Sequence, residues 1–327
     1  MDLTIRWKAV VILCLAMVCS VTGVAGAVDA DGTRFPTQPI SFILSLPAGS
    51  AGDMASRLIS KEAETILGKP IVIVNKPGGA HTIATATIAK AKPDGYTIGY
   101  VPPSPLFTVP FFEKLNYHPL EDLQGIIQYG EMRFGVITAS DAPFKTFKEM
   151  IEYARKNPGK MTYGTGGKNS IANISMEKIA REEHVRFTHI PFKASTEYQT
   201  ALLGKHVMFS AGEVNASLLE AGQLRLLLLF TEQRLPEYPQ VPTLKELGYK
   251  TSYPSLLAVM GPKGLPPAIL KKLEDAFTVA AKQPSVVKGM KDLRLNMVYR
   301  NSKELTEYVA HNYELYAQMI KETSKGK

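Results

Sequence analysis

The segment ISFILSLPAGSAGDMASRLISKEAETIL, residues 40–67, contains an apolar run, a loop of small residues and a helical pattern in succession. The apolar run over 40–46 predicts a buried β-strand. The apolar residues over 54–67 recur at the spacing of a helix that packs on one face. The loop PAGSAGD, residues 47–53, joins the two. A strand, a tight loop and a helix in this order are typical of an α/β domain.

The same alternation continues through the rest of the chain. Residues 71–74, IVIV, predict a strand that is buried on both faces. A helix over 82–91 and a strand over 96–101 complete a strand–helix–strand–helix–strand unit. After Pro119 the pattern starts again, and a second loop of small residues, GTGGKNS at 164–170, lies between a strand and a helix. We therefore predict two α/β units, each with a mainly parallel sheet and right-handed crossovers.

The two loops, 47–53 and 164–170, occupy matching positions in the two units. Such loops lie at the carboxyl ends of the strands, where α/β folds bind ligands. The first amides of the helix that follows have no intrahelical partner and attract anions. We expect the pair of loops to bind an anion from both sides of a cleft, with Ser45, Ser50 and Ser170 as hydroxyl donors.

Other kinds of site have little support in the sequence. The second loop is no phosphate-binding loop, because Tyr163 stands where such a loop needs glycine and Asn169 where it needs Ser or Thr. The chain has neither a G-x-S-x-G nor an H-E-x-x-H motif, so we expect no cofactor, no metal and no catalytic residue. We interpret His81 as a surface residue of its loop. Asp53 either pairs with Arg57 one helical turn later or faces the ligand.

Composition places the chain among ordinary globular proteins. It has 327 residues, enough for about two domains, and 45% of them are hydrophobic, enough for a sizeable core. Lys and Arg total 38 against 30 Asp and Glu, a formal charge of +8. These charges are dispersed, which favours a solvated mixed surface over a nucleic-acid-binding face.

The N-terminus has the pattern of an export signal. Arg6 and Lys8 precede an unbroken apolar run over 9–19, and Ala-Gly-Ala follows at 25–27. This pattern predicts a signal peptide over residues 1–27, cleaved after Ala27. Retention as a membrane anchor is the alternative, although a span needs about 20 apolar residues. Both cysteines lie before the cleavage site, so the mature periplasmic chain would contain no disulfide.

Seven segments in a fixed order form a more specific combination than any of them alone. They are FPTQPISFILSLPAGSAGDMASRLI (35–59), LGKPIVIVNKPGGA (67–80), AKPDGYTIGY (91–100), MTYGTGGKNS (161–170), HIPFKASTEYQTALLGKHVMFSAGE (189–213), AGQLRLLLLF (221–230) and PEYPQVPTLKELGY (236–249). With them the chain resembles the substrate-binding receptors of tripartite tricarboxylate transporters, the Bug-type periplasmic receptors, over nearly all of residues 36–300. The resemblance implies a two-lobed periplasmic binding protein fold of type 2, with the ligand cleft between the lobes.

The resemblance also implies which residues bind the ligand. The elements are the two small-residue loops, a third loop at 192–197 and a fourth around 211–213. The expected ligand-binding residues are Pro47, Ala48, Gly49, Ser50, Ala51, Asp53, Gly164, Thr165, Gly166, Gly167, Ser170, Phe192, Ala194, Ser195 and Glu213. The chain departs from the family at Ala80–Ile83, where a Gly-rich run is usual, at Asn173, where His is frequent, and at 192–194, where Tyr-Lys-Gly is usual. These departures leave the identity of the ligand open.

We expect a periplasmic, monomeric receptor that performs no chemistry. It would capture a small organic acid and deliver it to the integral membrane subunits of the transporter. Candidate ligands are di- and tricarboxylates, aromatic carboxylates and amino acids, in that order. We expect lobe one over 28–128 plus 252–327 and lobe two over 129–251. The alternatives are a ligand sensor that feeds a signalling receptor, which neighbouring genes would identify, and an exported enzyme that uses the cleft.

Overall fold

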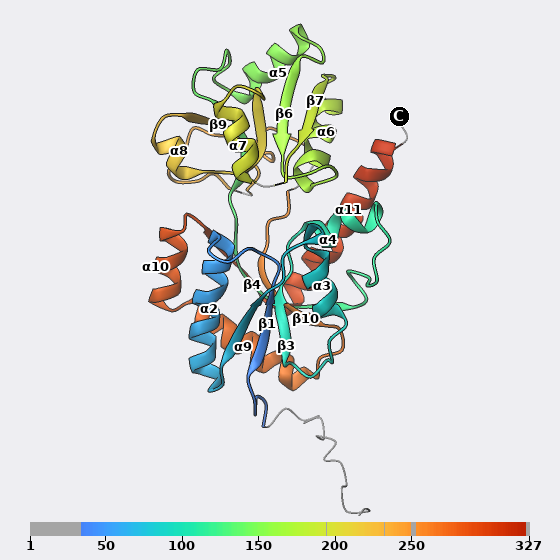
Figure 1. Cartoon of the computed structure of the whole chain (residues 1–327), viewed down its shortest axis with the longest axis vertical. Helices are drawn as coiled ribbons and strands as arrows, with labels where there is room; N and C mark the ends of the chain where they lie inside the picture. Colours follow the sequence, from blue (N-terminus) through green and yellow to red (C-terminus); the bar gives the residue numbers. More distant parts are fainter. Residues whose placement is uncertain (1–33, 194, 232, 250–252, 325–327) are drawn as a thin grey trace, which may run out of the picture.

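The chain folds into two lobes, each built around its own β-sheet (Figure 1). The computed structural model describes residues 34–324 except 194, 232 and 250–252, so the expected signal peptide lies outside the described residues. In chain order, lobe one first contains β1 (Ile40–Leu44), α2 (Ala51–Leu67), β2 (Ile71–Asn75), η1 (Gly79–His81), α3 (Thr82–Ala89), β3 (Thr97–Tyr100), α4 (Ser104–Phe107), η2 (Val109–Phe111) and β4 (Leu123–Glu131). After lobe two it adds β10 (Leu257–Pro262), α9 (Pro267–Ala281), α10 (Pro284–Asp292), β11 (Asn296–Arg300) and α11 (Ser302–Ser324).

Lobe two is a single stretch of chain inserted between β4 and β10. It contains β5 (Phe134–Ala139), α5 (Phe147–Lys156), β6 (Met161–Thr165), α6 (Ile171–Glu182), β7 (Phe187–Pro191), α7 (Ser195–Leu203), β8 (Phe209–Glu213), α8 (Ala216–Glu220) and β9 (Leu224–Leu229). No helix in the described part of the chain is long and apolar enough to cross a membrane.

Both sheets are mixed rather than mainly parallel. The six-stranded sheet has the order β11-β4-β10-β3-β1-β2, and β10 is antiparallel to both of its neighbours. The five-stranded sheet has the order β7-β6-β8-β5-β9, and β5 is antiparallel to both of its neighbours. The two-lobed α/β fold is confirmed, but the expected strand direction is wrong in this detail. The parallel strands of each sheet run toward the cleft. β5 and β10 enter their sheets from the cleft after a crossing between the lobes, so they run away from it and are antiparallel to their neighbours.

Each sheet is covered by helices on both faces, which gives the molecule four apolar clusters. In lobe one, α2, α9 and α10 pack on one face of the sheet, and α3, α4 and α11 pack on the other. In lobe two, α5 and α6 cover one face, and α7 and α8 cover the other. Residues 71–74 are not buried on both faces as predicted, since β2 is an edge strand and Val72 is 49% exposed.

The chain crosses between the lobes twice. β4 pairs within the first sheet up to Glu131 and β5 pairs within the second from Phe134, so Met132 and Arg133 form the first crossing. The second crossing leads into β10. The lobe boundary that we expected after residue 128 falls inside β4, and the one expected at 252 lies outside the described residues. Two adjacent crossings of this kind form a hinge.

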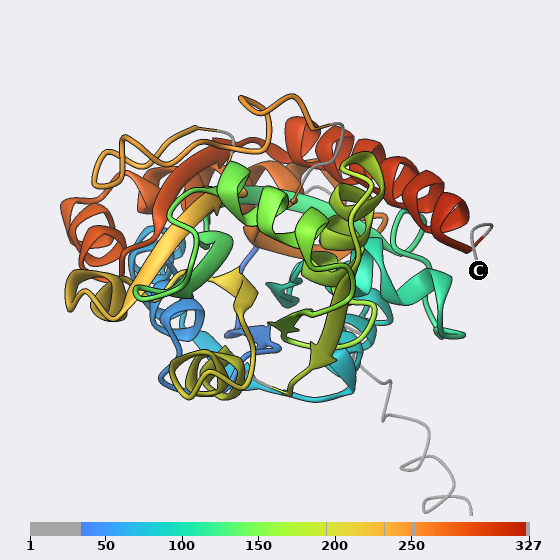
Figure 2. The ribbon, with the colours of Figure 1, turned by 90° about the horizontal axis from the view of Figure 1, so that it is seen from above.

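α11 makes a further connection, because it packs against both lobes. Its C-terminal half lies beside α6, as the views from the side and from above both show (Figures 1 and 2). Ile171 and Ile174 of α6 share an apolar cluster with Tyr316 of α11. The hydroxyls of Ser175 and Tyr316 form a buried hydrogen bond of 3.1 Å. The start of α6 is therefore supported from lobe one.

Candidate ligand site between the lobes

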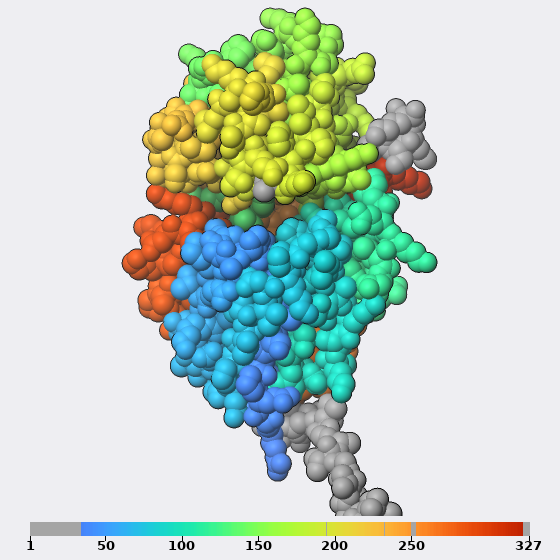
Figure 3. Space-filling model, viewed as in Figure 1, coloured from blue at the N-terminus to red at the C-terminus, as the bar shows by residue number. Residues whose placement is uncertain are grey.

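A cavity of about 650 Å³ lies between the two lobes. The space-filling view shows the groove that separates them (Figure 3). Of the residues expected from the sequence, those that line the cavity are Pro47, Ser50, Ala51, Gly166, Ser170, Ser195 and Glu213. Those that do not line it are Ala48, Gly49, Asp53, Gly164, Thr165, Gly167 and Phe192, and Ala194 lies outside the described residues. The four expected segments thus meet at one cavity, each through some of its residues.

The first loop ends in a helix cap that faces this cavity. The Ser50 side chain accepts a hydrogen bond of 3.3 Å from the backbone N–H of Asp53. The Asp53 carboxylate in turn accepts one of 2.9 Å from the backbone N–H of Gly49. This reciprocal cap starts α2 at Ala51, three residues before the expected Met54. The amides of Ala51 and Gly52 in the first turn have no intrahelical acceptor and lie at the cavity.

The second loop repeats this cap in lobe two. The Ser170 side chain accepts a hydrogen bond of 3.3 Å from the backbone N–H of Asn173. The Asn173 side-chain oxygen accepts one of 3.2 Å from the backbone N–H of Asn169. Ile171 and Ala172, the first residues of α6, line the cavity. Two capped helix N-termini, one from each lobe, are thus directed at the same cavity, and their dipoles favour a negative charge there.

Asp53 holds the first loop from behind instead of facing the ligand. It is almost fully buried, and Arg57 donates to both of its oxygens, at 3.0 and 3.1 Å. Asn75 of β2 donates a further hydrogen bond of 2.8 Å. Burial alone would raise the pKa of this carboxyl, but the hydrogen bonds from Arg57, Asn75 and Gly49 outweigh it and lower the pKa. Of the two roles considered from the sequence, the geometry favours the ion pair with Arg57.

The three serines expected as donors differ in their surroundings. The Ser50 hydroxyl donates a hydrogen bond of 3.0 Å to the Pro47 carbonyl, and the Ser170 hydroxyl donates one of 3.3 Å to the Thr165 hydroxyl. These two protons are therefore used within their own loops. Ser45 lines the cavity, is fully buried, and its hydroxyl has no hydrogen-bond partner among the described residues. A buried hydroxyl without a partner costs free energy, which a bound ligand would recover.

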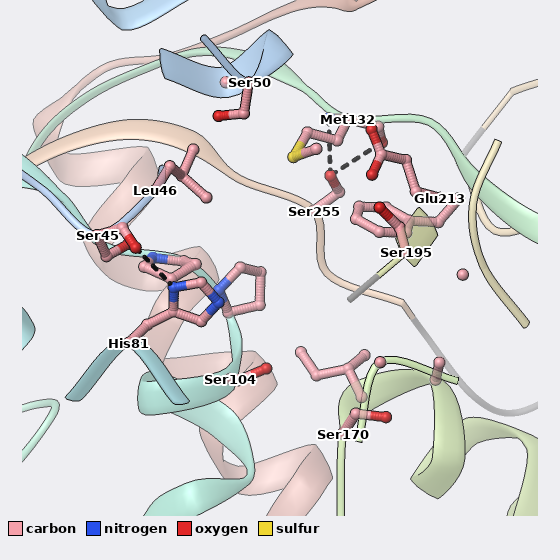
Figure 4. Close-up of a pocket in the computed structure, with 18 of the residues that line it drawn as sticks. Ser45, Leu46, Ser50, His81, Ser104, Met132, Ser170, Ser195, Glu213 and Ser255 are labelled. Carbon is pink, nitrogen blue, oxygen red and sulfur yellow. Dashed lines mark hydrogen bonds between the residues drawn. The ribbon is translucent and has the colours of Figure 1, made fainter. Parts of the chain in front are cut away.

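His81 lies at the cavity and not on the outer surface that we expected. Its ring Nδ1 is 3.2 Å from the Ser45 carbonyl, to which it donates because a carbonyl only accepts (Figure 4). Burial lowers the pKa of His81, and the contact with Ser45 opposes this only in part, which leaves the ring neutral at pH 7. His81 has φ +74, and the Gly78-Gly79 turn before it is the only sequence signal that marks this position.

Glu213 and a group of tyrosines form another part of the wall. Glu213 is the last residue of β8, and Figure 4 shows its side chain beside Ser195 and Ser255. Burial raises the pKa of Glu213, and a hydrogen bond from Ser195 lowers it by less. Tyr100, Tyr198 and Tyr253 also line the cavity. Burial raises the pKa of all three phenols, so they are neutral hydrogen-bonding groups at pH 7.

The hinge closes the back of the cavity. Met132 and Ser255 come from the two crossings, and both line the cavity. The backbone N–H of Met132 donates a hydrogen bond of 2.9 Å to the Ser255 hydroxyl. That hydroxyl donates one of 3.0 Å back to the Met132 carbonyl. Gln128 of β4 donates 3.1 Å to the Ser255 carbonyl. The two crossing segments are thus joined to each other directly behind the ligand space.

The ionisable groups at the cavity are few. Of the described residues that line it, only His81, Lys193 and Glu213 have ionisable acidic or basic side chains. Within the described residues no group of three or more His, Cys, Asp or Glu is arranged to hold a metal ion. The arrangement can bind a small polar molecule through amides, hydroxyls and phenols. Fold and site together define a two-lobed ligand-binding protein.

Comparison with known proteins identifies the family. The model of the tripartite tricarboxylate transporter family receptor, TctC, matches residues 55–324. The chain is 35% identical over 300 residues to a UPF0065 protein from the gbd 5′ region of Cupriavidus necator, with 91% of each chain covered. It is 27% identical over 306 residues to protein BugT of Bordetella pertussis, with 92% of this chain and 93% of that one covered. The chain belongs to the TctC family of transporter receptors.

Solved structures agree with this assignment. A ligand-free TctC solute-binding protein from Polaromonas has a TM-score of 0.76 at 25% identity, with 88% of this chain and 99% of that chain covered. MatC from Rhodopseudomonas palustris with bound malate has a TM-score of 0.73 at 25% identity, with 88% and 100% covered. Both comparisons extend over the two lobes, so the similarity includes the cleft.

Proposed function

We propose that this protein captures a small organic carboxylate between its lobes and delivers it to the integral membrane subunits of a tripartite transporter. The observation that carries the proposal is the pair of capped helix N-termini, at Ser50 and Ser170, that face one cavity. Free amides at a helix N-terminus, together with its dipole, stabilise an anion without a fixed cation. MatC, which is similar over both lobes, has malate bound.

The remaining parts of the proposal concern the context of the receptor. Receptors of this family are periplasmic. We propose that residues 1–27 are a signal peptide cleaved after Ala27, that the mature chain works as a monomer, and that it catalyses no reaction. The resemblance to transporter receptors supports delivery to a membrane partner over signalling.

A thermal-shift screen tests capture of a carboxylate. A ligand that binds only the folded protein at a hundredfold excess over Kd stabilises it by about 2.7 kcal/mol. For a chain of this size that raises the melting temperature by about 5 °C or more. Carboxylates are expected to give the shift, and the corresponding amides are not. A shift with a neutral sugar or a cation, and with no acid, would contradict the proposal.

A Gly166→Val variant tests whether the cavity is the site. Gly166 lines the cavity, and a Cβ there meets no atom within 4 Å, so the fold tolerates the side chain. The added group would occupy ligand space, and we expect affinity to fall at least tenfold, about 1.4 kcal/mol. Thr65→Val, on the exposed side of α2, is the matched control. Equal affinity of both variants would place the ligand elsewhere.

A further inference from the structure

Glu213 is the one acidic side chain among the described residues that line the cavity. Its position is fixed through the backbone. Its N–H donates 2.8 Å to the Tyr198 hydroxyl, and its carbonyl accepts 3.4 Å from the Gln199 side chain. It also pairs with Phe134 of β5 across the sheet. These contacts from α7 and β5 fix the backbone of Glu213 and so the point on the cavity wall from which its side chain extends.

Among the described residues, three cations line a pocket together with this carboxyl: Lys193 in the cavity, and Arg133 and Arg294 in the space beside it. Arg133 is paired with Glu237 and Arg294 with Glu220. Within the described part of the chain no Lys, Arg or His lies within salt-bridge distance of Glu213, and its side-chain hydrogen bond comes from Ser195. The phenols that face it, those of Tyr100, Tyr198 and Tyr253, have raised pKa values and carry no charge. Burial without a counter-ion disfavours the ionised carboxylate, and a cationic group placed beside it stabilises that form.

Another part of the cavity favours the opposite charge. The starts of α2 and α6 favour an anion, whereas Glu213 favours a cation or a strong hydrogen-bond donor. A ligand that binds favourably both at the helix starts and at Glu213 carries a negative and a positive group. Resting on the proposed function, we infer that Glu213 binds an ammonium group and that the captured acid is an amino acid or a related zwitterion. The carboxylate lies at the two helix starts and the ammonium group at Glu213.

A ligand whose only charged groups are carboxylates binds better when Glu213 is protonated than when it is ionised. It would share the cavity with a like charge unless Glu213 were protonated, so its binding would become tighter as the pH falls through the pKa of Glu213. A zwitterion that pairs with the ionised Glu213 binds more weakly over the same range, because protonation removes the partner of its ammonium group. The direction of the pH dependence therefore distinguishes the two ligand classes.

Calorimetry with matched pairs of acids tests the inference. The pairs are aspartate with succinate, glutamate with glutarate, leucine with 4-methylpentanoate and phenylalanine with 3-phenylpropanoate. Within a pair only the ammonium group differs. We expect at least a tenfold preference for the amino member of at least one pair, with binding that weakens as the pH is lowered. Plain acids that bind at least as tightly as their amino partners in every pair, or an amino member whose binding tightens as the pH is lowered, would overturn the inference and leave carboxylate capture intact. Binding of no acid at all would overturn both.

Variants of Glu213 assign the preference to this side chain. Glu213→Gln is expected to reduce the preference for the amino member to less than threefold. Glu213→Asp keeps the charge and retains part of the preference, which provides the test if the Gln variant folds poorly. Glu152→Gln, exposed on α5, is the matched control and is expected to bind like the wild type. A preference that survives unchanged in Glu213→Gln would overturn the assignment.

Discussion

At the scale of single residues, Asp53 shows how a buried charge can shape a ligand loop from outside the cavity. Its carboxylate accepts hydrogen bonds from Gly49, Arg57 and Asn75, and these fix the loop, the helix start and the end of β2 together. Gly49 has φ +82, a conformation that glycine adopts at little cost. The side chain is nearly inaccessible to solvent, whereas Arg57 is half exposed.

We expect Asp53→Asn to lose about 1.5–3 kcal/mol of unfolding free energy at pH 7, the range for hydrogen bonds to a charged group. The folded-state pKa of Asp53 is lowered, so its contribution is present above the unfolded value near 4 and is lost as the pH falls through the folded pKa. The difference between variant and wild type should therefore shrink toward pH 3. Urea unfolding at both pH values measures it.

Asp275→Asn provides the control, because Asp275 has the same i, i+4 spacing from Lys271, in the reverse order of charges, but is exposed. Exposed pairs of this kind contribute little to stability, because solvent screens their charges. An equal loss in the two variants would show that burial and the additional hydrogen bonds at Asp53 have no energetic role.

At the scale of elements, the starts of α2 and α6 depend on serine caps. We expect Ser50→Ala and Ser170→Ala each to cost about 1 kcal/mol in unfolding free energy, because one amide of the first turn loses its acceptor. Ligand affinity should also fall in each variant as the loop loosens. Chemical denaturation and calorimetry measure the two effects.

Ser60→Ala is the control within the same helix. Ser60 is buried in α2, and its hydroxyl has no hydrogen-bond partner among the described residues. Removal of a buried hydroxyl without a partner is expected to leave stability unchanged or raised. If Ser60→Ala were as destabilising as the two cap variants, capping would not explain their loss.

At the scale of the whole molecule, α11 couples the lobes through its contact with α6. We expect Tyr316→Ala to cost about 3–5 kcal/mol, as for other large aromatic residues removed from a core. Tyr316→Phe removes the hydroxyl that bonds Ser175 and is expected to cost about 1 kcal/mol. Calorimetry should then show the two lobes of Tyr316→Ala melting separately. A single transition with wild-type stability would contradict this coupling.

Ligand-driven closure belongs to the same scale. A ligand in the cleft favours the closed form only if it contacts both lobes better there than in the open form. The two crossings, at Met132–Arg133 and before β10, allow a hinge motion. Small-angle scattering should show a smaller radius of gyration with an acid that gives the thermal shift. An unchanged radius at saturation would rule out closure of this kind.

Local patterns in the sequence were sufficient for most of the elements and for the position of the cavity. Apolar spacing and small-residue loops predicted β1, α2, the start of α6 and the meeting of the loops, because these depend on residues a few positions apart. The resemblance to the receptor family added the segments around Ser195 and Glu213. All four predicted segments contribute residues to the cavity.

Tertiary structure alone decided which side chains face the cavity and in which direction each strand runs. Asp53 turns away toward Asn75, and His81 enters the cavity beside Ser45. Glu213 has Tyr198 and Ser195 as hydrogen-bond partners among the described residues. Each outcome depends on residues far away in sequence. β2 is exposed because it lies at a sheet edge, and β5 and β10 are antiparallel because they enter from the cleft. Periodicity within one segment records which side chains share a face. Periodicity does not indicate which distant segment packs on that face, because the packing partner depends on the fold of the whole chain.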